Sequence, residues 1–182
     1  MSGLSEERLE SSLVYDGTLL KVRRDEVRLP DGKHAIREYI HHPGASVVIA
    51  FLDNGYLLLE RQFRYPLNRV FIEMPAGKMD PGETPLQCAR RELLEETGYV
   101  AEHWREIATL HPCIGYSDER LVYFLARNLS FSRKNTDEGE HIEHVELPLR
   151  DALEMVGKGE ITDIKTITGL FWAEKMQGGF WK

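Results

Sequence analysis

The N-terminal part of the chain alternates apolar and polar residues in short pieces, a pattern typical of strands with one solvated face. The alternation covers residues 13–39 and is interrupted at Asp16-Gly17 and Asp31-Gly32, two dipeptides that favour hairpin turns. The first ten residues are polar and acidic, and we expect them to be frayed. The pattern therefore predicts a small antiparallel β-sheet ahead of the main body of the protein.

Longer apolar runs follow and predict the strands of a larger, buried sheet. These strand patterns lie at residues 45–51, 55–61, 70–74, 104–111, 121–129 and 144–147. Helical periodicity covers residues 149–156 and 164–176, and Asp163 is the expected N-cap of the second helix. Residues 132–140 are polar and predict a long loop. Propensity alone leaves the fold class open between α+β and α/β.

Composition narrows the class of protein. The chain has 182 residues, 42% hydrophobic and 29% charged, which predicts one soluble domain with a short extension. We divide it into an N-terminal β segment at 1–42 and a main domain at 43–182. A net charge of −7 argues against nucleic-acid or anionic-membrane partners. We expect a cytoplasmic protein, because no signal or membrane-spanning segment is visible and the two cysteines lack disulfide or ligand spacing.

Three carboxylates crowd together shortly before a glycine: Glu92, Glu95 and Glu96 precede Gly98. On a helix, like charges three or four residues apart repel by roughly 0.2–0.5 kcal/mol per pair. A divalent cation reverses the sign of that interaction, because Mg²⁺ prefers carboxylate oxygens together with substrate phosphates. In isolation, such a cluster would more often be a solvated acidic helix face.

The surrounding residues predict a helix over residues 84–97 that has well-marked ends. Thr84 is the expected N-cap, Pro85 suits the first helical position, and Gln87 completes a capping box. Gly98 suits the left-handed conformation after the last turn. At about 100° per residue, the glutamates share one arc of the helix and an apolar stripe occupies another. That stripe consists of Leu86, Ala89 and Leu93.

The spacing of seven residues resembles the box of the Nudix hydrolases, G-x5-E-x7-R-E-U-x-E-E-x-G-U, in which U is aliphatic. The seven are Gly77, Glu83, Arg91, Glu92, Glu95, Glu96 and Gly98. Leu93 fills the first aliphatic position, and Tyr99 departs from the pattern at the second. The resemblance implies an α/β/α sandwich with a mixed sheet behind the small N-terminal sheet. It also implies hydrolysis of a pyrophosphate bond with Mg²⁺, for which Mn²⁺ is a possible substitute.

The same resemblance implies roles for the residues of the box. Glu92 and Glu96 are the first choices as metal ligands, together with the backbone carbonyl of Ala76. Glu95, on the other flank, is expected to be a further ligand or to support catalysis beside them. Three more residues are expected to orient these ligands rather than to touch the cation: Gly77, Glu83 and Arg91.

Two segments outside the box, RQFRYP at 61–66 and FIEMPAG at 71–77, resemble the ADP-ribose pyrophosphatases. This resemblance implies that Arg64 contacts a phosphate with two donors, although a surface arginine at a strand end is the alternative. Glu73 is expected to contact the metal or a substrate hydroxyl, and Arg37 is a weaker candidate for substrate binding.

A third segment, HPCIGYSDE at 111–119, resembles the same subfamily in part and implies that Glu119 lines the site. Ile114 stands where the subfamily has a proline linked with ADP-ribose preference, which weakens the assignment of the substrate but not of the chemistry. The resemblance further implies a catalytic base on the loop at 132–140. Glu138 is the first choice and Glu140 the second, with a solvated acidic loop as the alternative.

The favoured function is hydrolysis of nucleoside diphosphate sugars, with ADP-ribose cleaved to AMP and ribose 5-phosphate. GDP-mannose or another nucleotide sugar is the alternative within this class. A non-catalytic nucleotide-binding module is the alternative from a different class, and the retained carboxylates argue against it. Hydrolysis of mRNA caps or dinucleoside polyphosphates would leave the two extra segments unexplained. The resemblance also implies a homodimer formed through the N-terminal β segment.

Overall fold

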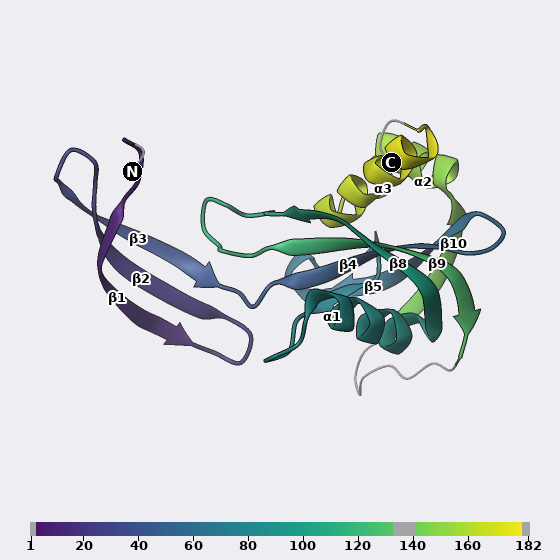
Figure 1. The fold of residues 1–182 in the computed structure, drawn as a ribbon, viewed down its shortest axis with the longest axis horizontal. Helices are drawn as coiled ribbons and strands as arrows, with labels where there is room; N and C mark the ends of the chain where they lie inside the picture. The colour runs from purple at the N-terminus through teal and green to yellow at the C-terminus, as the bar shows by residue number, and fades with distance from the viewer. Residues whose placement is uncertain (1–2, 133–140, 180–182) are drawn as a thin grey trace. The chain divides into compact units, whose positions relative to one another are not determined.

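The computed structural model describes residues 3–132 and 141–179 and divides the chain into two compact units (Figure 1). The first unit consists of Met1–Pro43 and His111–Arg120. The second consists of Gly44–Leu110 and Leu121–Lys182. The expected base candidates Glu138 and Glu140 lie outside the described residues.

The first unit is a three-stranded antiparallel sheet in the order β1-β2-β3, as the alternation predicts. Its strands are β1 (Glu7–Asp16), β2 (Lys21–Arg28) and β3 (His34–His41). The expectation that the first ten residues are frayed is wrong from Glu7 onward, because Glu7 pairs with Arg28 in the ladder and through a 2.9 Å ion pair. Backbone hydrogen bonds and charge pairs hold the first residues of β1 in the sheet, although these residues lack the apolar alternation that would predict a strand.

The second unit is built on a mixed sheet in the order β10-β5-β4-β9-β8, with β6 added to β5 and β7 to β4. The central pair β4–β9 is parallel and the other neighbours are antiparallel. The first four strands are β4 (Ala45–Phe51), β5 (Tyr56–Arg64), β6 (Arg69–Glu73) and β7 (Ala76–Lys78). The last three are β8 (Tyr99–Leu110), β9 (Leu121–Phe131) and β10 (Ile142–Pro148). A 3₁₀ turn, η1 (Tyr65–Leu67), connects β5 to β6.

Helices cover both faces of this sheet, so the expected α/β/α arrangement with a mixed sheet is confirmed (Figure 1). On one face, Leu57 and Leu59 pack with residues of α2 (Leu149–Gly157) and α3 (Ile164–Gln177). On the other, Leu58 packs against α1 (Pro85–Glu92). No helix within the described ranges is long and apolar enough to cross a bilayer.

The helix that carries the box glutamates begins as expected and then changes its winding. Thr84 caps α1 in a capping box with Gln87. After α1 the chain continues as a π-helical turn, η2 (Leu93–Thr97), and Gly98 ends it at φ 78°. The uniform α-helix expected over 84–97 is therefore wrong in its last turn. A π-turn places more residues in each turn than an α-helix, and such turns are frequent at functional sites.

Candidate active site

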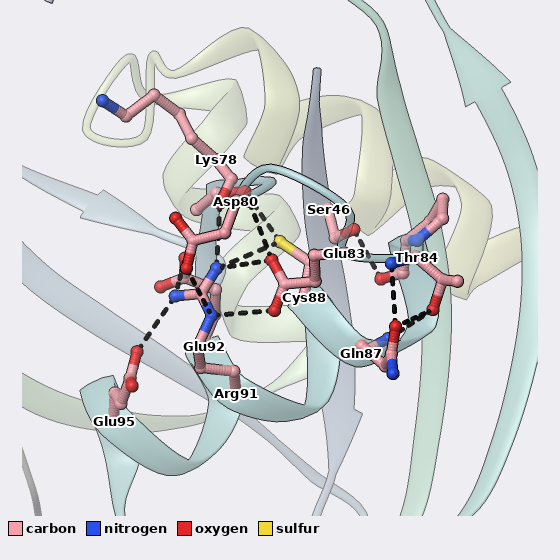
Figure 2. A network of polar contacts seen from close by, with 12 residues as sticks. Ser46, Lys78, Asp80, Glu83, Thr84, Gln87, Cys88, Arg91, Glu92 and Glu95 are labelled. Carbon is pink, nitrogen blue, oxygen red and sulfur yellow. Dashed lines mark hydrogen bonds and ion pairs between the residues drawn. The ribbon is translucent and has the colours of Figure 1, made fainter. Parts of the chain in front are cut away.

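Arg91 lies at the centre of a polar network at the end of α1 (Figure 2). Its Nε and Nη2 donate to the two carboxylate oxygens of Glu83, both at 2.9 Å. Its Nη1 donates to Glu92 at 2.7 Å and to Glu95 at 3.0 Å. Nη2 also donates to the backbone carbonyl of Lys78 at 2.9 Å. One guanidinium therefore fixes the loop before the helix and the orientation of two box carboxylates.

Glu83, at the loop side of this network, is held as an ionised carboxylate. The hydrogen bonds from Arg91, opposed by a smaller effect of burial, hold the pKa of Glu83 below its ordinary value, so it remains a carboxylate. Glu83 also accepts a hydrogen bond from the backbone N–H of Asp80 at 3.0 Å, which closes the loop. Both oxygens of Glu83 accept hydrogen bonds from Arg91, whereas Glu92 and Glu95 share a single donor, Nη1 of Arg91.

Gly77, on β7, lies in close contact with the helix that carries Glu92. A Cβ at this position would lie 1.9 Å from Oε1 of Glu92, far inside van der Waals contact. The Sγ of Cys88 donates to the carbonyl of Gly77 at 3.3 Å and ties the same residue to α1. Only glycine lets the backbone and the Glu92 carboxylate occupy these positions together.

Glu96 lies on the π-turn and is 5% exposed. Its side chain points towards the backbone of β7. One of its carboxylate oxygens accepts a hydrogen bond from the N–H of Ala76 at 3.0 Å. Its backbone carbonyl accepts one from Nε2 of His144 on β10, at 2.8 Å. These contacts bring the box turn, β7 and β10 to one place.

A second group of charged side chains surrounds Glu73, which is 2% exposed. Arg64 donates to both oxygens of Glu73 at 2.7 Å, and Lys165 at the start of α3 forms an ion pair with it. Burial alone would raise the pKa of Glu73, but the hydrogen bonds from Arg64 and the charge of Lys165 outweigh it and lower the pKa. A hollow of about 240 Å³ opens beside these residues and also touches Leu67, Phe71 and Asp163.

Glu60 on β5 is the least expected member of this group, since it is fully buried. Neither of its carboxylate oxygens accepts a hydrogen bond from a donor in the described part of the chain. Burial, and then the charge of Glu73, raise the pKa of Glu60 to about 8. The carboxylate of Glu96 faces it.

The oxygen donors at this end of the sheet fit a hard divalent cation. Carboxylates and backbone carbonyls are the ligands that Mg²⁺ and Mn²⁺ prefer. Both oxygens of buried Glu60 lack a hydrogen-bond donor among the described residues, so its ionised form would gain from a bound cation. No three carboxylate, imidazole or thiol groups of the described residues already stand in ligand geometry, and Arg91 supplies the positive charge that Glu92 and Glu95 face.

Replacing Gly77 with alanine is expected to weaken binding of Mn²⁺ by about 10–100-fold, the range seen when a group that orients a metal ligand is lost. The physical reason is that the added Cβ displaces the Glu92 carboxylate. The measurement is a titration of the purified protein with Mn²⁺. Gly157→Ala is the matched control, because a Cβ there meets no atom within 4 Å. Equal affinities in both variants would contradict a ligand role for Glu92.

The remaining expected site residues belong to the N-terminal unit. Arg37 lies on β3 and forms a two-donor ion pair with Glu6, with Nε at 2.9 Å from one carboxylate oxygen. Glu119 is half-buried in the segment 111–120, where its carboxylate lies 3.8 Å from Nδ1 of His42. The same segment is joined to β3 by the hydrogen bond from Ile40 N–H to the Tyr116 carbonyl at 2.8 Å.

Three residues of this region were not anticipated from the sequence: Glu60, His144 and Lys165. Glu60 carried a signal, because an acidic residue directly after Leu57–Leu59 interrupts an apolar run that belongs to a buried strand. Lys165 carried a weaker one, as a cation in the first turn of a helix, where the helix dipole disfavours it. His144 carried none, since its role depends on the register of β10.

Two family descriptions match the chain and together cover nearly all of it. "NUDIX domain" matches residues 40–168. "Nucleoside diphosphate sugar hydrolase N-terminal domain" matches residues 6–40, which contain the three-stranded sheet.

Individual relatives agree with this match. An ADP-ribose pyrophosphatase of Bacillus subtilis (strain 168) is 39% identical over 168 residues, 91% of each chain. A GDP-mannose pyrophosphatase of Yersinia pestis (strain Pestoides F) is 38% identical over 150 residues, 76% of this chain and 75% of that one. A crystal structure described as an ADP compounds hydrolase superimposes with a TM-score of 0.86 at 21% identity, over 96% of this chain and 95% of that one, and shows the shared fold.

Proposed function

The chain belongs to the Nudix family, and from that premise we propose that it hydrolyses the pyrophosphate bond of nucleoside diphosphate sugars. ADP-ribose is the first substrate, and addition of one water to it yields AMP and ribose 5-phosphate. The observation that carries the proposal is the Arg91 network, in which the box residues Glu83, Glu92 and Glu95 are all retained and oriented. The name of the Bacillus subtilis relative supports the choice of substrate.

The proposed cofactor is Mg²⁺, with Mn²⁺ as a substitute, held by Glu92, Glu96 and the carbonyl of Ala76, with Glu95 beside them. Bound there, the cation would neutralise the diphosphate and make a water molecule more acidic. The chain's own part is to hold these oxygens in place. Arg91 does this for Glu92 and Glu95, and the N–H of Ala76 does it for Glu96. Gly77 makes room for Glu92.

Four residues are proposed to contact the substrate: Arg64, Glu73, Arg37 and Glu119. In the second unit, Arg64 and Glu73 border the 240 Å³ hollow, where Arg64 would exchange its contact with Glu73 for a phosphate. In the first, Arg37 and Glu119 are proposed to contact the nucleotide sugar. Glu138, or else Glu140, is proposed to accept the proton of the attacking water, a task that requires a carboxylate near neutral pH.

The test is a panel of substrates assayed with excess MgCl₂ by chromatography of the nucleotide products, with an EDTA control. The panel contains ADP-ribose, GDP-mannose, ADP-glucose, NADH, a dinucleoside polyphosphate and dGTP. Fastest release of AMP from ADP-ribose, abolished by EDTA, is the expected result. Faster cleavage of GDP-mannose would favour the second candidate, which the Yersinia pestis relative supports. Binding of a nucleotide sugar without turnover would overturn the proposal in favour of a non-catalytic module.

We expect the protein to be a homodimer joined through the N-terminal sheet. The sheet and its first turn expose apolar side chains that a lone chain would leave in water, among them Leu13 at 45%, Tyr15 at 57% and Leu19 at 64%. The measurement is light scattering at micromolar concentration. A monomeric mass would contradict the prediction.

A location in the cytoplasm is part of the proposal, supported by Cys88 and Cys113, which are both free thiols.

A further inference from the structure

Glu60 is a carboxylate where the sheet otherwise presents leucines. Leu57, Leu58 and Leu59 precede it on β5 and are all essentially buried, and Glu60 is buried as fully as they are. Side chains alternate between the faces of a strand, so Glu60 shares a face with Leu58, the face that packs against α1. A buried carboxyl group is tolerated only where a partner compensates its charge or where it stays protonated. Because Glu60 lies on the side of the box helix, a compensating partner has to lie between β5 and that helix.

The pairing register of the sheet places Glu60 beside the π-turn at Leu93–Thr97. Glu60 lies directly opposite Glu73 on β6 and opposite His144 on β10. Directly opposed residues point to the same face. His144 from this row reaches the backbone carbonyl of Glu96 at 2.8 Å. The row therefore borders the π-turn, and the carboxylate of Glu96 faces that of Glu60.

The cations near Glu60 are committed elsewhere. Arg64 uses two donors on Glu73 at 2.7 Å, and Lys165 pairs with Glu73 and with Asp163, the latter at 2.9 Å. Glu60 feels their charge at longer range but accepts a hydrogen bond from neither. Two carboxylates, Glu60 and Glu96, thus face one another in a buried place, and their repulsion is relieved by a shared positive charge.

We propose that Glu60, which lies outside the Nudix box, contributes a further carboxylate to the divalent-cation site from strand β5. This inference rests on the proposed function, because it presupposes that Glu96 binds a cation. Glu60 and Glu96 then form a pair of oxygen ligands from two different elements, one on the sheet and one on the π-turn. The strand, which is rigid and buried on both faces, would fix one ligand independently of the box loop.

The competing explanation is a structural glutamic acid that stays protonated and shares its proton with Glu96. The two explanations differ in one measurable quantity, the affinity for a divalent cation without substrate. If Glu60 is a ligand, removing its carboxylate lowers the affinity for the cation. A protonated core residue can be replaced by glutamine, which keeps its shape and a donor, without affecting cation binding.

The experiment compares binding of Mn²⁺ to the purified full chain and to Glu60→Gln, by electron paramagnetic resonance without substrate. The expected result is a dissociation constant raised about tenfold or more in the variant, the size of effect seen when a metal site loses a supporting group. Glu106→Gln is the matched control, because it makes the same replacement of a glutamate at an exposed position on β8. Circular dichroism verifies that each variant is folded.

Glu60→Leu is the second variant, because leucine continues the run at 57–59 and suits a buried strand even if an amide does not. Weakened Mn²⁺ binding in both Glu60 variants, with Glu106→Gln unchanged, supports the inference. Unchanged binding in either folded variant overturns it and leaves the proposed function standing, since the wild-type protein still binds the cation. Absence of Mn²⁺ binding by the wild-type chain overturns both.

Discussion

Replacing Glu96 with glutamine should lower kcat by about 10²–10⁴-fold, corresponding to the several kcal/mol that a catalytic cation contributes. Glutamine has nearly the same shape as glutamate and keeps an oxygen that can accept the 3.0 Å hydrogen bond from Ala76. It also leaves intact the backbone carbonyl that His144 contacts. The fold should therefore persist, and the loss should come from the missing negative charge on the proposed ligand.

The measurement is the steady-state rate of AMP release from ADP-ribose, or of nucleotide release from whichever diphosphate the panel shows to be cleaved. Mn²⁺ binding and thermal unfolding are measured on the same preparation. Without cation, the variant should be at least as stable as wild type, because it removes one of the buried carboxylates that face each other. Glu106→Gln serves again as the control. A kcat close to that of wild type would exclude Glu96 as a ligand.

The strands and helices could be predicted where the information is local. The capping box of Thr84 and Gln87 and the left-handed glycine at 98 are decided by neighbours within four residues, and both appear as expected. The sandwich itself followed from the resemblance of the box rather than from propensity, which left the class open. The start of β1 was missed, because residues 7–10 are held by pairing with β2 and not by an apolar pattern.

The winding of the box helix could not be predicted from helical periodicity. Angular arithmetic at about 100° per residue assumes i→i−4 hydrogen bonds throughout. The π-turn over Leu93–Thr97 breaks that assumption in the segment that carries Glu95 and Glu96. The buried Thr97 hydroxyl donates to the Leu93 carbonyl inside this turn. A sequence pattern could mark these glutamates as belonging together, but it could not place them around a cation.

Some contacts of the charged groups near the box could be predicted from local spacing, and others depend on how distant strands pair. Opposite charges eight residues apart could indicate that Glu83 and Arg91 tie the loop to the helix, and they form the expected two-donor contact. Arg64 and Glu73 were each expected to contact substrate or metal, and their mutual pairing depends on the register of β5 against β6. Glu60, His144 and Lys165 meet this region only through the sheet order and the start of α3, which are non-local.

Replacing Glu138 with glutamine should lower kcat by about 10²–10⁴-fold, the range for loss of general acid–base catalysis. The physical reason differs from that for Glu96, because a base accepts a proton from water and need not touch the cation. Binding of Mn²⁺ should therefore stay at the wild-type level in Glu138→Gln and fall in Glu96→Gln. The measurements are kcat as a function of pH, where the base would set the acidic limb, and Mn²⁺ titration without substrate.

Glu140→Gln and Asp137→Asn complete this test, because each removes one charge from the same acidic stretch at 137–140. A large loss of kcat in Glu138→Gln alone assigns the base to that residue. A large loss in Glu140→Gln alone moves the assignment two residues along. Similar modest losses in all three would mean that the stretch acts through its summed charge, and the base would then have to be sought among the box carboxylates, with Glu95 first. Each outcome names a different atom as the proton acceptor, so the comparison separates base catalysis from cation binding.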